Sequence, residues 1–148
     1  MPFPQFDRFQ VRMKPLKERP NKVVIERDQV DPSAPPRLSE LALRQMGEVV
    51  ERIRSARAAG KPVMLAHGAH TIKNCLAPVM IRLMEEGWIT HLATNGAGII
   101  HDWEFAWQGE SSEDVRANVA RGEFGNWEET GFCINLALNV GAYEGRGY

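Results

Sequence analysis

The stretch that decides the fold is KPVMLAHGAHTIKNCLAPVMIRLMEEGWITHLATNGAGIIHDWEFAWQ, residues 61–108. Its pattern is strand, turn, helix, strand, turn and helix. The short apolar run at 62–66 has glycines on both sides, which is typical of a strand buried on both faces. From 71 to 86 apolar residues recur at three- and four-residue spacing, which predicts a helix that Gly87 ends. A second strand is expected over 89–94.

Two strands joined by a helix at this spacing predict a right-handed crossover between parallel strands. Ligands of such sheets bind beyond the carboxyl ends of the strands. Both turns at those ends contain glycine, HGAH after the first strand and NGAG after the second, and three of the four histidines fall there. We therefore expect the functional site at this edge. The GxGxxG fingerprint is absent, so glycine spacing alone does not distinguish phosphate-binding turns from plain tight turns.

The totals describe an ordinary globular chain of 148 residues, 43% hydrophobic and 25% charged, with a net charge of −1. This length fits one domain with a real core, and the small net charge argues against a nucleic-acid partner. Cys75 and Cys133 lie in apolar segments without metal-ligand spacing, which predicts reduced thiols and a cytoplasmic location. No apolar run approaches ~18 residues and no signal-peptide pattern is present, so we expect no membrane association.

Residues 1–37 contain seven prolines and predict an extended N-terminal arm with one short strand at 22–26. The α/β domain is expected over 38–148. Three phenylalanines recur at three-residue spacing in the arm, and either anchor it in apolar grooves or pack loosely on their own domain: Phe3, Phe6 and Phe9.

Several helices flank or follow the central stretch. An apolar stripe between the cap Ser39 and Gly60 predicts a helix packed in the core. Further helices are expected over 98–108, over 111–120 with Ser-Ser-Glu-Asp as its start, and over 131–143, which is apolar on most sides and so largely buried. A doubly wound sheet usually needs about five or six strands. We therefore expect this chain to be the front part of a longer protein or to complete its sheet through a partner chain.

Four histidines lie within 35 residues, and two carboxylates follow the last: His67, His70, His91, His101, Asp102 and Glu104. Imidazole and carboxylate together bind a divalent metal or act as acid and base near neutral pH. His67, His70 and His101 could converge at the strand ends. Lys73 could meet an anion or a substrate carboxylate. Both carboxylates also have a structural explanation, because acidic side chains at a helix start interact favourably with its dipole.

At these residues, ATNGAGIIHDWEFAWQG and HGAHTIKNCLAPVMIRLMEEGWI resemble the NAD-binding region of the deoxyhypusine synthase-like superfamily, which includes the ornithine-cyclizing domain of the LOR/SDH family. In that domain a strand ending in Gly-Asn and small residues precedes a His-Asp-x-Glu helix start. Here the order is Asn95-Gly96, followed by His101-Asp102-Trp103-Glu104. The resemblance covers residues 61–114, about a third of the chain.

The resemblance implies a Rossmann-like three-layer α/β fold with parallel strands, in a homotetramer that binds NAD and acts on an amine or amino-acid substrate by hydride transfer. By the same resemblance, cofactor contacts fall on two turns: His67, Gly68, Ala69 and His70 after the first strand, and Thr94, Asn95, Gly96 and Ala97 after the second. The candidate catalytic residues are His101 or Asp102 as base, with Asp102 or Glu104 beside a cationic substrate.

The sequence also departs from the family. The synthases' nucleophilic lysine lies late in the chain, whereas here no lysine follows Lys73, and their later acidic and Trp-rich motif has no counterpart before Tyr148. We therefore do not expect a chain of this length to transfer an aminobutyl group to a protein lysine. Two alternatives remain: a non-catalytic nucleotide-binding or assembly subunit of the same fold, and a metal-dependent hydrolase that uses the histidine cluster.

Overall fold

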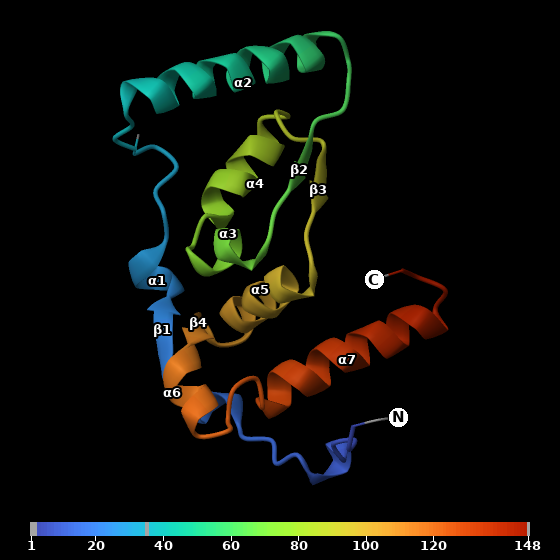
Figure 1. The fold of residues 1–148 in the computed structure, drawn as a ribbon. Helices are drawn as coiled ribbons and strands as arrows, with labels where there is room; N and C mark the ends of the chain where they lie inside the picture. The colour runs from blue at the N-terminus through green and yellow to red at the C-terminus, as the bar shows by residue number, and fades with distance from the viewer. Residues whose placement is uncertain (1–2, 35, 148) are drawn as a thin grey trace.

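The computed structural model describes residues 3–34 and 36–147, and it shows a mixed α/β architecture (Figure 1). The described residues form two small sheets. One is a parallel pair of β2 (Met64–Ala66) and β3 (His91–Ala93), and the other is an antiparallel pair of β1 (Asn21–Val24) and β4 (Glu110–Glu113). The helices are α1 Ile25–Asp28, α2 Glu40–Ala58, α3 Ala69–Lys73, α4 Ala77–Glu85, α5 Gly96–Gln108, α6 Val115–Ala120 and α7 Glu128–Tyr143, with 3-10 turns η1 Arg8–Gln10 and η2 Leu16–Glu18. Among the described residues, we find no helix with the length and apolar character to cross a membrane.

The parallel pair confirms that the two predicted strands pair in parallel, and the pairing continues one residue further, where the His67 N–H donates to the Ala93 carbonyl at 2.9 Å. The prediction that the first strand is buried on both faces is wrong. Met64 is 67% exposed, whereas Leu65 is partly covered. One face of the pair is therefore open, and the third layer of a three-layer fold is not among the described residues.

The single helix predicted over 71–86 is wrong, because the chain breaks it into α3 and α4. Cys75, between the two, takes a left-handed backbone conformation with φ of 58°, which side chains with a Cβ rarely adopt. Pro78 then occupies the first turn of α4, where its missing N–H costs nothing. Gly87, at φ 74°, follows the helix as its predicted stop. Burial raises the pKa of the Cys75 thiol, with a contribution from the charge of Asp28.

Helices α2 and α7 are far more exposed than their apolar patterns predict. Ser39 caps α2 as expected, accepting a hydrogen bond from the Ala42 N–H at 3.2 Å. No residue of α2 is buried, however, and Val49 is 55% exposed, so the prediction of a core stripe is wrong. Helix α7 buries only Thr130 and leaves Phe132 65% exposed, so its predicted burial is also wrong. Both helices lie at the periphery of the molecule (Figure 1), and the described residues cover their apolar faces only in part.

The N-terminal segment contains the predicted short strand, and residues other than its phenylalanines hold it to the domain. Its strand forms as β1, but β1 pairs with β4 in a separate antiparallel sheet and adds nothing to the parallel pair. Three phenylalanines are at least three-quarters exposed, so they do not anchor the segment in grooves of this chain: Phe3, Phe6 and Phe9. Leu16 and Arg19, which are 0% and 6% exposed, tie the segment to the domain instead.

The chain after α5 also differs from the prediction. The helix start expected at 111–114 is instead the strand β4, and only Asp114 acts as a cap, accepting a hydrogen bond from the Ala117 N–H at 3.0 Å to begin α6. The main apolar core consists of Ile72, Cys75, Met80 and Phe105. It joins α3 and α4 to α5, and so fixes the helix that carries the candidate residues.

Candidate functional site

Helix α5 is the frame of the site, because it holds His101 and Glu104 three residues apart on one face. Asn95 caps its start, its side-chain oxygen accepting a hydrogen bond at 3.1 Å from the backbone N–H three residues on. Gly109 ends the helix in a left-handed conformation, with φ of 73°. This conformation turns the chain directly into β4 and brings Ser111 beside the helix.

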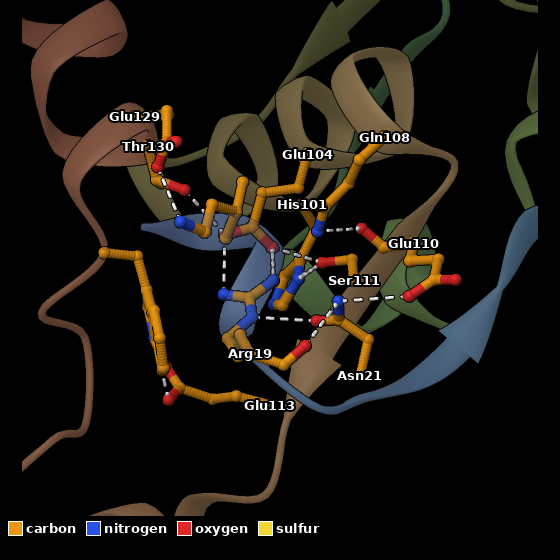
Figure 2. Close-up of polar contacts among 12 residues, drawn as sticks. Arg19, Asn21, His101, Glu104, Gln108, Glu110, Ser111, Glu113, Glu129 and Thr130 are labelled. Carbon is orange, nitrogen blue, oxygen red and sulfur yellow. Dashed lines mark hydrogen bonds and ion pairs between the residues drawn. The ribbon is translucent and has the colours of Figure 1, made fainter. Parts of the chain in front are cut away.

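Glu104 lies at the centre of a buried polar network (Figure 2). It is 1% exposed, and its carboxylate accepts four hydrogen bonds. Arg19 donates two of them, Nη1 to Oε1 at 2.8 Å and Nη2 to Oε2 at 2.6 Å; Ser111 Oγ donates to Oε2 at 2.5 Å and Thr130 Oγ1 to Oε1 at 3.0 Å. Burial raises the pKa of Glu104, but these bonds and the charge of Arg19 outweigh it, so the pKa is lowered and the carboxylate is ionised at neutral pH.

Arg19 is itself held from two further directions. Its Nε donates to Asn21 Oδ1 at 2.7 Å, and its guanidinium carbon lies 5.5 Å from the centre of the Trp127 ring. Trp127 in turn donates from its indole nitrogen to Glu113 at 3.0 Å. The N-terminal segment therefore supplies the counter-charge of the site, because Arg19 comes just before β1.

His101 joins this network through one ring nitrogen, Nδ1, which lies 2.7 Å from Ser111 Oγ. Burial lowers the pKa of His101 below its ordinary value of 6.5. The charge of Glu104 opposes this shift, while the interactions with Lys73, Arg19 and His70 add to it. The imidazole is therefore neutral at neutral pH, and it can accept a proton.

A pocket of about 380 Å³ opens beside His101, and Lys73, Ala97 and Trp127 also line it. Two carboxylates face it, but both are already engaged. Glu104 is paired with Arg19, and Glu113 accepts hydrogen bonds from Trp127, from the Asn118 amide at 2.6 Å and from the Gly125 N–H at 3.2 Å. Within the described part of the chain, the Lys73 side chain has no ion pair or hydrogen bond. The uncompensated charge of the pocket is therefore positive.

The two turns expected to bind a cofactor lie side by side. A Cβ added to Gly68, the residue before α3, would lie 3.8 Å from the Asn95 side-chain nitrogen. His67 follows β2, and its Nε2 is buried with no hydrogen-bond partner among the residues described. Ala97, in the first turn of α5, reaches the pocket beside His101. The two turns thus adjoin each other, and the second of them adjoins the pocket.

The remaining predicted residues are placed elsewhere or differently. Asp102 is exposed and borders a small hollow of about 30 Å³ that also contacts Ile72, so it does not share the pocket with its neighbour His101. His91 lies exposed at the start of β3, with Nδ1 2.8 Å from Thr90 Oγ1. In residues 3–34 and 36–147, no three His, Cys, Asp or Glu side chains are arranged to hold a metal ion, so the geometry gives the metal-dependent alternative no support.

Three residues of the network are not among those that the sequence patterns pick out: Arg19, Ser111 and Thr130. Arg19 is one of several basic residues in an irregular arm, and nothing local marks it. Ser111 resembles a helix cap, and Thr130 sits in an apolar helix as an ordinary small residue. The sequence feature that points to the network is the three-residue spacing of His101 and Glu104, which predicts that the two side chains lie on the same face of their helix.

Comparison of the chain with known proteins found no relative. We found no protein-family model, no curated protein and no solved structure that matches the chain. The resemblance drawn from the sequence therefore stays a prediction. The case for a function depends on the geometry of the pocket and the two turns.

Proposed function

We propose that the chain binds NAD at the turns after β2 and β3 and oxidises an amine-bearing substrate, an amino acid, by hydride transfer in the adjoining pocket. One observation carries this proposal: Ala97, from the second turn, lines the same pocket as His101 and Lys73. The volume of about 380 Å³ lies in the range of small-ligand sites. A cofactor on the turns and a small substrate in the pocket would therefore share one space.

The open backbone of the first turn supports the proposed dinucleotide. Apart from the Asn95 amide and the chain neighbours of Gly68, no described atom lies within 4 Å of the position that a Cβ on Gly68 would take, so the backbone there can approach a ligand closely. The contacts would come from 67–70 on one side and from 94–97 on the other. When bound, NAD supplies the hydride acceptor, while the protein supplies orientation and charge.

The chain's own residues would divide the remaining work. Lys73 would pair with the substrate carboxylate and fix its orientation. His101, neutral because its pKa is lowered, would take a proton from the substrate ammonium onto Nε2. The lone pair freed on the amine would assist loss of hydride from the adjacent carbon: the C–H bond would break with its electron pair leaving as hydride to the acceptor that bound NAD supplies, a C=N bond would form, and the substrate would leave as an iminium ion.

The charges of the pocket favour an amino acid over a polyamine. Both carboxylates that face it, Glu104 and Glu113, are engaged within the protein, and the free charge is that of Lys73. A polycation would have to approach Lys73 without a free acidic partner, which costs energy in a partly desolvated site. Glu104 holds Arg19, so it is not available for the expected contact with a cationic substrate.

Calorimetric titration of NAD into the full chain tests the cofactor. We expect saturable binding that Asn95→Ala weakens. Because this variant also loses a helix cap, Ser39→Ala, which removes the cap of α2 far from the turns, is the matched control and should bind like wild type. No binding at millimolar NAD would refute the proposal, and so would binding that Asn95→Ala leaves unchanged.

Absorbance of NADH then tests the substrate class. Amino acids and polyamines are compared in the presence of NAD, with wild type, Lys73→Ala and Lys73→Arg. We expect turnover of an amino acid, with a KM that rises in Lys73→Ala and recovers in Lys73→Arg. Turnover of polyamines alone, or the same KM in Lys73→Ala as in wild type, would contradict the assignment of Lys73 as the partner of the substrate carboxylate.

The exposed apolar faces support a second element of the proposal, a homo-oligomer. Val49 on α2 and Leu136 on α7 are 55% and 49% exposed, and both belong to longer apolar rows. Rows of this kind are typical of surfaces that another chain covers. The same observation favours, as a second candidate function, a non-catalytic assembly subunit; NAD binding without turnover of any amine would support it.

A further inference from the structure

Ser111 connects the buried ion pair to His101, and its hydrogen bonds have a definite direction. The residue is 0% exposed, and its Oγ lies 2.5 Å from Glu104 Oε2 and 2.7 Å from His101 Nδ1. A hydroxyl carries one hydrogen, and an ionised carboxylate can only accept. The hydroxyl hydrogen therefore goes to Glu104. Ser111 Oγ is left to accept a hydrogen bond from His101, which requires a proton on Nδ1.

The ionised state of Glu104 is itself secured by structure. Its two oxygens receive a bidentate pair of hydrogen bonds from Arg19, and the Thr130 hydroxyl donates to one of them. Protonation of the carboxylate would leave Arg19, 6% exposed, without its counter-charge. Arg19 thus keeps Glu104 ionised, Glu104 makes the Ser111 hydroxyl a donor, and Ser111 Oγ can then only accept from the imidazole.

We propose that Ser111 is a positioning residue that holds His101 as the Nδ1-protonated tautomer and leaves Nε2 as the proton acceptor in the pocket. His101 lines the pocket, and among the residues described its Nε2 has no hydrogen-bond partner. The charged and titratable groups that face His101 are Glu104 on its own helix, His70 and Lys73 on α3, and Arg19 from the N-terminal segment. The consequence for turnover rests on the proposed function, but the tautomer does not.

The tautomer is measured in the unliganded full chain by long-range proton–nitrogen correlation of ¹⁵N-labelled histidine rings, above the pH at which His101 is protonated. We expect wild-type His101 to carry its proton on Nδ1. In Ser111→Ala the acceptor is gone, and we expect the population to move to the Nε2-protonated form that free histidine prefers. Thr130→Val is the matched control, because it also removes a hydrogen bond to Glu104 but leaves His101 Nδ1 untouched.

An Nε2-protonated His101 in wild type would overturn the proposal, and this measurement needs no variant to fold. An unchanged tautomer in Ser111→Ala, or the same loss in Thr130→Val, would also overturn it. If the proposed oxidation is found, Ser111→Ala should lower kcat by roughly tenfold or more with little change in KM, whereas Thr130→Val should not. If His101 has the expected tautomers but no amine is oxidised with NAD, the proposed function is refuted and the role of Ser111 is not.

Discussion

Replacing Glu104 by glutamine tests the buried ion pair, and with it the assembly of the whole site. The two side chains are 3% and 1% exposed, and they share two charge-assisted hydrogen bonds of 2.8 Å and 2.6 Å. Glutamine has nearly the same shape but no charge. In either orientation, its NH₂ group faces one of the guanidinium N–H groups of Arg19, so one of the bonds is lost and the Arg19 charge is left unpaired.

Removing one partner of a buried ion pair destabilises a protein by about 3–5 kcal/mol, because the remaining charge is desolvated without compensation. Total stabilities of domains are about 5–15 kcal/mol, so Glu104→Gln should lose a large share of the fold's stability. For a chain of this size the corresponding fall in Tm is roughly 6–20 °C. The double variant Arg19→Met/Glu104→Leu should lose less than Glu104→Gln alone, because it leaves no buried charge.

Urea unfolding followed by tryptophan fluorescence measures this loss, since Trp127 lies against Arg19. The exposed pair Arg82–Glu86 is the matched control: its N–O distance is also short, at 2.7 Å, but its side chains are 51% and 47% exposed. Glu86→Gln should therefore change the midpoint very little. A Glu104→Gln variant within about 0.5 kcal/mol of wild type would refute the reasoning.

Three further predictions concern pH, glycine geometry and assembly. The pKa of His101 in the folded chain lies below its ordinary value of 6.5, so the unfolded chain binds this proton first as the pH falls. The stability of the folded state should therefore decrease as the pH falls from about 6.5, and it should level off below the pKa of the folded chain. In urea midpoints measured over this pH range, His101→Asn should remove most of the decrease. Gly109 has a φ of 73°, so Gly109→Ala should lower the free energy of unfolding by about 1–2 kcal/mol. Gly47 lies inside α2 with no described atom within 4 Å of an added Cβ, so Gly47→Ala should raise it by about 0.5–1 kcal/mol. Shifts of the same sign in the Tm of the two variants would contradict this. If other copies of the chain cover α2 and α7, Val49→Asp and Leu136→Asp should lower the mass measured by light scattering without changing helix content, and an unchanged mass would count against a homo-oligomer built on these faces.

Features with a local cause could be predicted from the sequence. Ser39 and Gly87 mark helix ends through their own chemistry, and the structure has both. The parallel pair followed from two apolar runs separated by a helix-forming stretch. The break at Cys75 is not predicted because the apolar spacing continues through it, although Pro78 is typical of the first turn of a new helix.

Burial and long-range pairing could not be predicted in the same way. The apolar spacing of α2 shows which face is apolar, but it carries no information on whether another element covers that face. The partner of Glu104 lies 85 residues earlier, and no local pattern distinguishes Arg19 from the other basic residues of its segment. The candidate histidines could therefore be recognised from the sequence, whereas the network that orients His101 required the structure.

The separation of Arg19 and Glu104 also bears on the order of folding. Closing a loop of 85 residues carries a larger entropic cost than forming the local turns at the ends of β2 and β3. The parallel unit can therefore form early, while His101 gains its fixed orientation only when the N-terminal segment docks under α5. A chain shortened to begin at residue 38 would keep the turns after β2 and β3 but leave the Glu104 carboxylate without its counter-charge. The proposed ligand binding at the turns and the proposed proton transfer at His101 should accordingly respond differently to such a truncation.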